Sequence, residues 1–261
     1  EVTWVVTGTP VENSLQDLWA LLALAAPGLL PPLREFTAQW RRPIEKEGDT
    51  ERLASLRRRI RPLLLRRTKD LVARDLPEKS SDVLSIGLRP AEARAYSRLL
   101  NRERQRVLGL LDDPDRNRVE ILASLMRLRI SATDPGTLES PSPKAAELVL
   151  RLREVREAGH RALVFSQFTS HLRVLRDILE QDGISTSYLD GGTARREQVI
   201  EDFRAGSQSA FLISLKAGGS GITLTEADYV FLMDPWWNPA AENQAVDRAH
   251  RIGQDRTVMV Y

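Results

Sequence analysis

The chain has 261 residues, enough for one large domain or two small ones, and 42% of them are hydrophobic and 28% charged. This balance is typical of a soluble globular protein. The chain contains no cysteine, which excludes disulfide bonds, thiolate metal sites and cysteine nucleophiles. The net charge of +2 predicts no particular partner. Of the 38 cationic residues only five are lysine, a skew that codon bias or the bidentate binding of phosphate by arginine would each explain.

The longest strongly apolar run, residues 18–26, is shorter than the roughly 20 residues that span a bilayer, so we expect no membrane association. It follows no basic segment and no initiator methionine, and it is therefore not a signal peptide. Residues 1–6 are typical of a strand that is already under way. We therefore expect the chain to be a piece of a longer protein.

Residues 1–34 predict a strand, a tight turn and a helix. Val2, Val5 and Val6 favour the strand, and Gly8 and Pro10 interrupt it. The apolar residues that follow recur at helical spacing, and they are Leu15, Leu18, Trp19 and Leu22.

Residues 35–142 predict a mainly helical zone. Within it, residues 51–74 contain nine cations and two anions, so this basic tract carries +7 while the rest of the chain sums to −5. The basic tract is either a packed helix with a solvated basic edge or a contact for nucleic acid. Residues 90–111 and 117–131 predict amphipathic helices, and proline, glycine and serine between 134 and 143 predict a linker.

Residues 143–261 alternate between helices and strands. The helices are expected at 144–158, 170–181, 194–204 and 240–251, and the strands at 161–166, 184–189, 209–214, 229–233 and 257–261. Short strands separated by helices predict an α/β fold, a parallel sheet with helices on both faces.

Function in such sheets lies in the loops beyond the carboxyl ends of the strands, here at 166–169, 190–193, 216–221 and 234–239. The glycine-rich loop 216–221 is either an anion cradle or a tight turn. Trp236 and Trp237 are adjacent in an extended segment, so at least one ring is expected to be exposed for stacking or groove contact.

The segment 244–254 reads Gln-Ala-Val-Asp-Arg-Ala-His-Arg-Ile-Gly-Gln. Arg248 and Arg251 are three residues apart and would share one face of a helix. Two guanidinium groups on one face suit a polyphosphate whose charge grows in a transition state. The alternative is a surface helix paired with Glu242 and Asp247.

With this segment the chain resembles the Swi/Snf-type ATPases, the helicase-like double-stranded DNA translocases of helicase superfamily 2. The similarity is collinear. Residues 7–19 resemble the third helicase motif, 65–72 and 75–79 the stretch between lobes, 163–169 the fourth motif, 188–192 with Arg196 and Phe203 the next segment, 214–225 the fifth motif, and 247–254 the sixth.

The resemblance implies a RecA-like fold and a motor in which two lobes hydrolyse ATP between them and step along duplex DNA. It assigns residues 1–34 to the edge of the first lobe, 35–142 to a basic helical linker and protrusion, and 143–261 to the second lobe. Arg248 and Arg251 would be arginine fingers, the catalytic residues that reach the γ-phosphate. The residues implied for nucleotide binding or coupling are Gln244, Gly253, Gln254, Thr7, Gly8 and Thr9.

The resemblance also implies a DNA-binding surface. Its expected residues are Ser166, Gln167, Lys216, Gly218, Gly219 and Trp237, together with Arg57, Arg58, Arg66 and Arg67 of the basic tract.

Two departures from the family pattern stand out. Many members have Asn where this chain has Thr223, which keeps a hydroxyl but loses the amide. No lysine lies in a Gly-Lys-Ser/Thr loop and no Asp-Glu pair occurs, so ATP and Mg²⁺ would be held mainly by the first lobe, which is absent here. The three histidines, 160, 171 and 250, do not have the spacing of metal ligands. Because the phosphate-binding loop and the acidic pair are missing, we expect no hydrolysis of ATP by the chain alone.

The expected partners are duplex DNA, the first ATPase lobe in cis, and RNA polymerase or another DNA-bound protein. Two other functions stay open, a non-catalytic DNA clamp and a protein-interaction scaffold. The expected compartment is the cytoplasm, at the bacterial nucleoid, or the nucleus if the source is eukaryotic.

Overall fold

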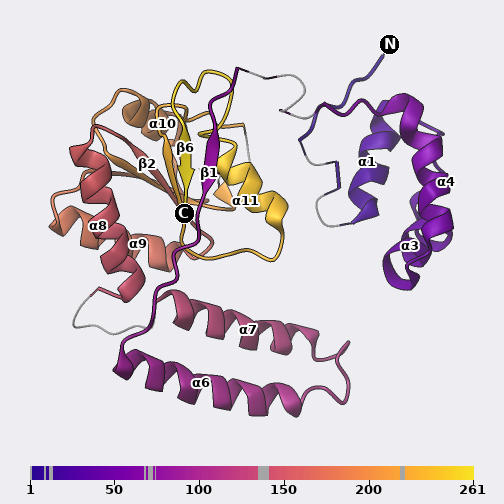
Figure 1. Ribbon diagram of the computed structural model, residues 1–261. Coiled ribbons are helices and arrows are strands. Elements are labelled where there is room, and N and C mark those ends of the chain that lie inside the picture. The colour runs from indigo at the N-terminus through magenta and orange to yellow at the C-terminus, as the bar shows by residue number, and fades with distance from the viewer. Residues whose placement is uncertain are drawn as a thin grey trace. The chain divides into compact units, whose positions relative to one another are not determined.

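The computed structural model describes residues 2–8, 10–11, 14–67, 69, 73, 75–134, 141–217 and 221–261. The chain divides into two compact units, Glu1–Arg74 and Asp75–Tyr261 (Figure 1). The second unit takes in both part of the expected helical zone and the α/β zone. The three zones expected from the sequence stay a prediction.

The second unit is built on a six-stranded parallel sheet with the strand order β1-β6-β5-β2-β4-β3. The strands are β1 (Lys79–Ser81), β2 (Ala162–Ser166), β3 (Thr186–Leu189), β4 (Ala210–Ser214), β5 (Tyr229–Leu232) and β6 (Val258–Val260). Five of them lie where the sequence predicts them, and the parallel α/β fold is confirmed. The central strands β2 and β4 are buried along their whole length, as expected when helices cover both faces of a sheet.

Successive residues of β2 enter different hydrophobic cores on the two faces of the sheet. Ala162 and Val164 pack with α8 (Pro143–Glu157) and α9 (Thr169–Gln181). Leu163 and Phe165 pack with α10 (Arg196–Arg204) and α11 (Pro239–Val246). Figure 1 shows α8 and α9 on one side of the sheet and α11 on the other. Because all the strands run parallel, their carboxyl ends, and the loops that follow them, lie at one edge of the sheet between the two helix layers.

The structure differs from the sequence prediction at two places in the second unit. β1 was not predicted, because its three residues are polar and exposed and it is held only by pairing with β6 at the edge of the sheet. The predicted linker contains a helix start instead of a plain loop. The Ser142 hydroxyl accepts a hydrogen bond from Ala145 N (3.3 Å) and Pro143 occupies the first turn, so α8 begins at Pro143.

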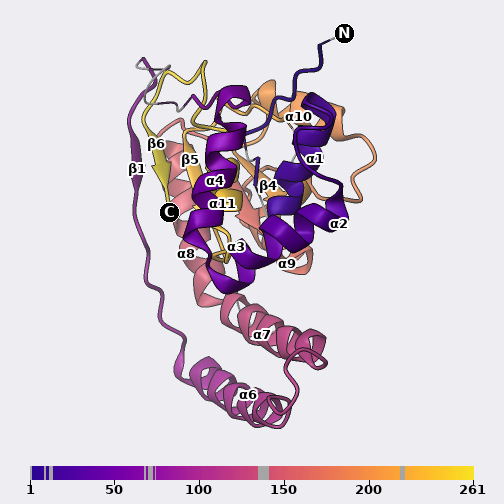
Figure 2. The same cartoon turned by 90° about the vertical axis from the view of Figure 1, so that its right-hand side faces the viewer.

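The helices α6 (Pro90–Leu108) and α7 (Arg118–Thr133) form an antiparallel pair, which we call the helical hairpin. Figure 2 shows the same two helices alongside each other from a second direction. Both were predicted from their spacing. Arg127 of α7 makes a bidentate ion pair with the buried Glu103 of α6, at 2.8 and 2.7 Å, and also donates to Ser124. A charged pair therefore locks the two helices together.

The Arg127 and Ser124 hydrogen bonds lower the pKa of Glu103 from 4.5 to about 2. A carboxyl group with a lowered pKa stabilises the folded state above pH 4.5, and this contribution is lost as the pH falls towards 2. We therefore expect the difference in unfolding free energy between the native chain and Glu103→Gln to shrink over that range. Thermal unfolding followed by circular dichroism at several pH values measures it. Glu120→Gln, which removes an exposed partner of Arg106, is the control, and equal pH dependence in both variants would contradict the prediction.

The first unit is helical. It contains α1 (Leu15–Ala25), α2 (Leu33–Phe36), a π-helical turn η1 (Thr37–Arg41), α3 (Arg42–Glu47), α4 (Thr50–Ile60) and a short 3₁₀ turn η2 (Arg61–Leu63). Ser14 and Asp17 form a capping box at the start of α1, the helix that the leucine spacing predicted. The core joins Leu15, Leu18 and Leu22 of α1 to Phe36 and to Leu56 and Ile60 of α4.

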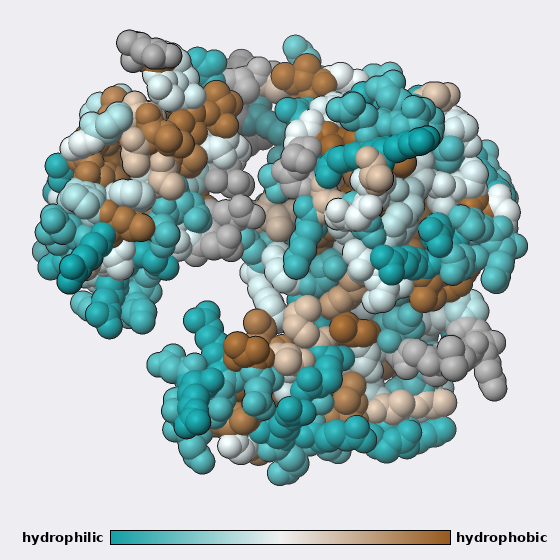
Figure 3. Space-filling model, turned by 180° about the vertical axis from the view of Figure 1, so that it is seen from behind, coloured by the Kyte–Doolittle hydropathy of each residue, from teal (hydrophilic) through white to brown (hydrophobic). Residues whose placement is uncertain are grey.

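The strand predicted for residues 1–6 is wrong for this structure. Residues 2–7 are not part of any sheet, since the described residues of this unit include no strand with which they could pair. Val2, Trp4 and Val6 are 77%, 85% and 95% exposed. Figure 3 shows hydrophobic surface on this unit. The unit therefore leaves apolar side chains uncovered. Across the described residues, no helix has the length and apolarity needed to cross a membrane.

Candidate functional site

The predicted helix over 240–251 ends earlier, at Val246, so Arg248 and Arg251 do not share a helical face. Asn238 caps the start of α11 through a hydrogen bond from Ala240 N (3.0 Å). After Val246 the backbone tightens, because Arg248 N and Ala249 N donate to carbonyls three residues back instead of four. The shared-face interpretation is therefore wrong, and the two arginines reach their surroundings from a series of turns.

Both arginines nevertheless hold the same short segment. Arg248 is buried and its Nη1 donates to the Ile222 carbonyl (3.4 Å). Arg251 is exposed and its Nη1 donates to the Thr223 hydroxyl (3.2 Å). The hydroxyl that replaces the family's amide is thus the group that Arg251 binds. Arg248 therefore holds this segment from inside the protein, and Arg251 holds it from the surface.

Two further arginines from α10 converge on the same loop. Arg196 donates to the Ala217 carbonyl, and Arg204 Nη2 donates to the Thr223 carbonyl (2.9 Å). We call the four side chains the arginine cluster, and its members are Arg196, Arg204, Arg248 and Arg251. Arg204 is neutralised by Glu201 and Glu226. None of the other three has a carboxylate within 4 Å among the residues that the structure describes.

The pKa of Arg248 reflects its position in the arginine cluster. Burial, together with the neighbouring cations of Arg196 and Arg251, lowers the pKa of its guanidinium to about 10, and Asp247 acts in the opposite direction. Its Nε atom is buried without a hydrogen-bond partner among the described residues. A buried cation with an unused donor and two like charges beside it fits an anion such as a phosphate group.

The other residues predicted for nucleotide coupling lie in different environments. Gln254 is buried, and its amide donates to the carbonyls of Thr225, Ala227 and Ala249. Gly253 has φ +104°, a conformation that favours glycine, and Gln244 lies on α11. Gln254 therefore braces the sixth-motif segment from within the unit. Thr7 and Gly8 are exposed in the first unit, and Thr9 lies outside the described residues.

A second group of predicted residues comes together at the end of β2. Ser166 is buried and its hydroxyl accepts a hydrogen bond from Phe168 N (3.0 Å). The backbone N–H of Gln167 donates to the carboxylate of Asp234 (3.1 Å), which follows the neighbouring strand β5. Burial raises the pKa of Asp234, and its hydrogen bonds from Ser166 and Gln167 partly offset the effect. Asp234 thus joins the loops after β2 and β5.

The tryptophan pair lies beside this group. The two rings are 5.3 Å apart, and Trp237 is 55% exposed, as expected for at least one of them. The guanidinium of Arg129, from α7, lies over both rings, 5.1 Å from the centroid of Trp236 and 4.6 Å from that of Trp237. Sequence reasoning missed both Arg129 and Asp234. Asp234 could have been found as an acidic residue directly after a buried strand, whereas Arg129 has no signal in the sequence.

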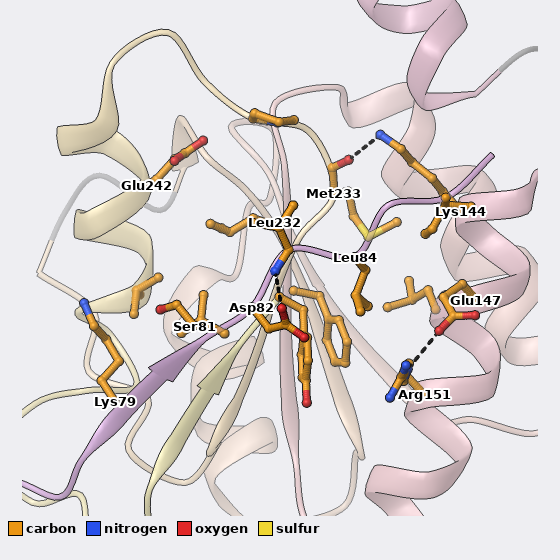
Figure 4. Close-up of a pocket in the computed structure, with 18 of the residues that line it drawn as sticks. Lys79, Ser81, Asp82, Leu84, Lys144, Glu147, Arg151, Leu232, Met233 and Glu242 are labelled. Atoms are coloured by element: carbon orange, nitrogen blue, oxygen red, sulfur yellow. Dashed lines mark hydrogen bonds and ion pairs between the residues drawn. The ribbon is translucent and has the colours of Figure 1, made fainter. Parts of the chain in front are cut away.

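A separate pocket of about 410 Å³ lies between α8, α11 and the ends of β5 and β6, beside the segment that follows β1 (Figure 4). Lys144 Nζ donates to the Met233 carbonyl (3.2 Å), and burial lowers the pKa of this ammonium group. Glu242 accepts a hydrogen bond from Trp236 N (2.5 Å). Two residues of the pocket wall therefore hold the backbone at Met233 and Trp236, in the segment that leads to Trp237.

The remaining predicted DNA-binding residues do not join these groups. Lys216 is exposed after β4, and Gly218 and Gly219 lie outside the described residues. Arg57 and Arg58 are exposed on α4, on a helix that buries Leu56 and Ile60. Arg66 and Arg67 are exposed beyond it, still within the first unit. The packed helix with a basic edge is thus confirmed for α4, and contact of the tract with nucleic acid stays a prediction.

Comparison with known proteins agrees with the fold and the motifs. The SNF2-related domain model matches residues 1–137, and the helicase conserved C-terminal domain model matches residues 144–253. The chain is 36% identical to an uncharacterized ATP-dependent helicase of Mycoplasma pneumoniae over 98% of its length, and 34% identical to the SWI/SNF-related matrix-associated actin-dependent regulator of chromatin subfamily A member 1 of Mus musculus over 98%. It spans 25% and 26% of the length of these two relatives.

A solved structure agrees as well. The SWI2/SNF2 ATPase core of Sulfolobus solfataricus in complex with double-stranded DNA superposes with a TM-score of 0.60 at 31% identity, covering 97% of this chain and 55% of that one. The RecA-like fold implied by the resemblance is confirmed. The chain belongs to the SNF2-related family, and its residues 144–253 form a helicase conserved C-terminal domain.

Proposed function

We propose that this chain is the second ATPase lobe, with the edge of the first, of a Swi/Snf-type motor that couples ATP hydrolysis to translocation along double-stranded DNA. The observation that carries the proposal is the arginine cluster, in which the catalytic candidates Arg248 and Arg251 hold the same segment, 222–223, directly after the glycine-rich loop. A change at the nucleotide is thereby transmitted to a loop that is expected to contact DNA.

The cluster fits the polyphosphate of ATP. Arg251 is exposed and reaches outward, and Arg248 supplies buried positive charge behind it. Charge that grows on the transferred phosphoryl group is stabilised by such guanidinium groups. Mg²⁺ would neutralise the β- and γ-phosphates, held by residues of the first lobe. This chain contributes the stabilising cations and has neither a Gly-Lys-Ser/Thr loop nor an Asp-Glu pair.

The proposed partner of the first unit is the rest of the first lobe, in the same polypeptide, which would cover its exposed apolar side chains. Val2, Trp4 and Val6 are exposed in a segment that pairs with no strand among the described residues, and Leu63, Leu64 and Leu65 are also exposed. Unpaired apolar segments of this kind are the usual edges of an incomplete sheet. We infer that preceding residues of a longer protein cover them.

Duplex DNA is the proposed track. The Sulfolobus core that this chain resembles was solved with double-stranded DNA. In this chain the exposed Trp237, the adjacent Gln167 and the exposed Lys216 are of the kinds that contact a groove and phosphates. We assign the grip on DNA to them and to the basic tract.

Binding of this chain to duplex DNA is expected to weaken steeply with salt, because each neutralised phosphate adds about −0.9 to the slope of log K against log salt. A variant in which glutamine replaces all four of Arg57, Arg58, Arg66 and Arg67 should have a shallower slope. The expected reduction corresponds to the loss of up to about four phosphate contacts. Fluorescence anisotropy with a labelled duplex at several salt concentrations measures both.

The matched control replaces four arginines that already have carboxylate partners, namely Arg151, Arg153, Arg173 and Arg176. Their charges are neutralised within the protein, so a smaller change in slope is expected. Equal changes in the two variants would contradict the assignment of the basic tract. Absence of DNA binding together with capture of RNA polymerase would instead favour the protein-interaction scaffold, and tight DNA binding by a full-length protein without ATP turnover would favour the DNA clamp.

A further inference from the structure

Arg129, on α7 of the helical hairpin, contacts three aromatic rings and two loops of the sheet. Its guanidinium lies 4.6, 5.1 and 5.9 Å from the ring centroids of Trp237, Trp236 and Phe168. Each distance is within the range of a cation–π interaction. The same guanidinium donates to Gln167 Oε1 (3.3 Å) and to the Pro235 carbonyl. One side chain of α7 thus contacts the loop after β2 and the loop after β5 together.

These contacts join segments that are distant in the sequence. Arg129 is 38 residues from Gln167 and 106 residues from Pro235. Lys144 and Glu242 hold the residues on either side of Pro235, since Lys144 donates to the Met233 carbonyl and Glu242 accepts from Trp236 N. Arg129 is therefore the contact through which the helical hairpin bears directly on the exposed Trp237 and on the side-chain amide of Gln167.

We propose that Arg129 is a positioning residue that orients Trp237 and Gln167 for contact with duplex DNA, so that the helical hairpin controls the grip of the second unit on its track. This inference rests on the proposed function, since it takes duplex DNA as the ligand of Trp237 and Gln167. Arg129 itself touches no nucleotide in this scheme. It acts by fixing one ring and one amide in a single arrangement.

The chemistry of the contact requires arginine. A guanidinium is planar, so it can stack on two rings while its N–H groups donate in its own plane to an amide oxygen and a carbonyl. Lysine keeps the charge but is a point charge on a flexible stem, and it cannot make these contacts at once. Arg129→Lys is therefore the informative substitution, because it separates the geometry of the side chain from its charge.

The first measurement uses the protein without DNA. The chain has five tryptophans, which labelling with 5-fluorotryptophan resolves by ¹⁹F NMR, and Trp236→Phe and Trp237→Phe assign two of the signals. In Arg129→Lys, the signals of Trp236 and Trp237 should shift and broaden while those of Trp4, Trp19 and Trp40, which lie in the first unit, stay in place. Unfolding followed by circular dichroism verifies that the hairpin, locked by Arg127 and Glu103, remains folded.

The second measurement is the affinity for a labelled duplex. Arg129→Lys should weaken binding by about 10-fold, the scale of one lost aromatic contact. Combining it with Trp237→Ala should add little further loss, because both changes remove the same contact. The matched control is Arg118→Lys on the same helix, an exposed arginine without a hydrogen bond or ion pair to any described residue, and it should bind like the native chain.

The outcomes separate the two proposals. Unmoved signals of Trp236 and Trp237 in Arg129→Lys would overturn the positioning role whatever the affinity. Shifted signals with native affinity would overturn the link from Arg129 to DNA. If the native chain itself does not bind the duplex, the proposed function is wrong and the DNA part of this inference is lost with it, while the ¹⁹F signals still decide whether Arg129 fixes the tryptophans.

Discussion

In the longer motor protein proposed above, replacing Arg251 with alanine is expected to lower DNA-stimulated ATP turnover by about 10³-fold, the lower end of the range for arginine fingers. The side chain is exposed, and its terminal Nη1 donates to the Thr223 hydroxyl, so the other N–H groups of the guanidinium can donate to a phosphate. It would stabilise charge that develops only as the phosphoryl group transfers. Turnover should therefore fall while the KM for ATP changes little.

Steady-state phosphate release at saturating duplex DNA measures this effect. Arg195→Ala is the matched control, since Arg195 is an exposed arginine at the start of α10 whose side chain makes no hydrogen bond or ion pair to the residues described in the structure. Its turnover should equal that of the native protein. A kcat for Arg251→Ala close to native would remove Arg251 from the catalytic machinery, and a raised KM with native kcat would make it a binding residue only.

Arg248 has a different expected effect because of its burial. Its guanidinium holds the Ile222 carbonyl inside the protein, so its loss disturbs the segment that Arg251 also holds. Two arginines that act on one segment are not expected to have additive effects. A double variant should therefore lose little more turnover than Arg251→Ala alone. Arg248 and Arg251 are thus coupled because both bind the segment 222–223, and not because they share a helical face.

The parallel sheet could be predicted because its signals are local. The strands β2 and β4 are continuous apolar runs, and the helices between them, α9 and α10, have an apolar spacing that a sequence displays directly. β1 could not be predicted, since Lys79, Ser80 and Ser81 have no apolar pattern and depend on β6, nearly 180 positions later in the chain, for every sheet contact.

The candidate site was predicted in part for the same reason. Motifs identified Arg248, Arg251, Gln167 and Trp237, each of which lies within a recognisable short segment. The contacts that organise them are long-range, such as Arg129 over the tryptophan rings or Asp234 with the Gln167 backbone. The end of α11 was misplaced because residues after Val246 keep helical apolar spacing while their hydrogen bonds tighten to the three-residue pattern.

The second large effect concerns residues 1–261 expressed by themselves, which are expected to hydrolyse no ATP above background, with or without duplex DNA. An ATPase of this class needs a Gly-Lys-Ser/Thr loop to hold the β- and γ-phosphates and an acidic pair for Mg²⁺ and water. None of the five lysines is preceded by glycine, and no Asp-Glu pair occurs. The arginine cluster can stabilise a transferring phosphoryl group only when another lobe presents it.

The control for this prediction is the same chain carrying Arg251→Ala. Phosphate release that is equal in both preparations comes from a contaminating ATPase, whereas release that falls with the substitution belongs to the chain and would contradict the prediction. Adding the first lobe of the full-length protein as a separate polypeptide should restore turnover that depends on Arg251. The arginine cluster supplies the stabilising cations, and the first lobe would supply the phosphate-binding groups. Catalysis therefore requires that the two lobes close on the same nucleotide, and this explains why turnover should return when both are present.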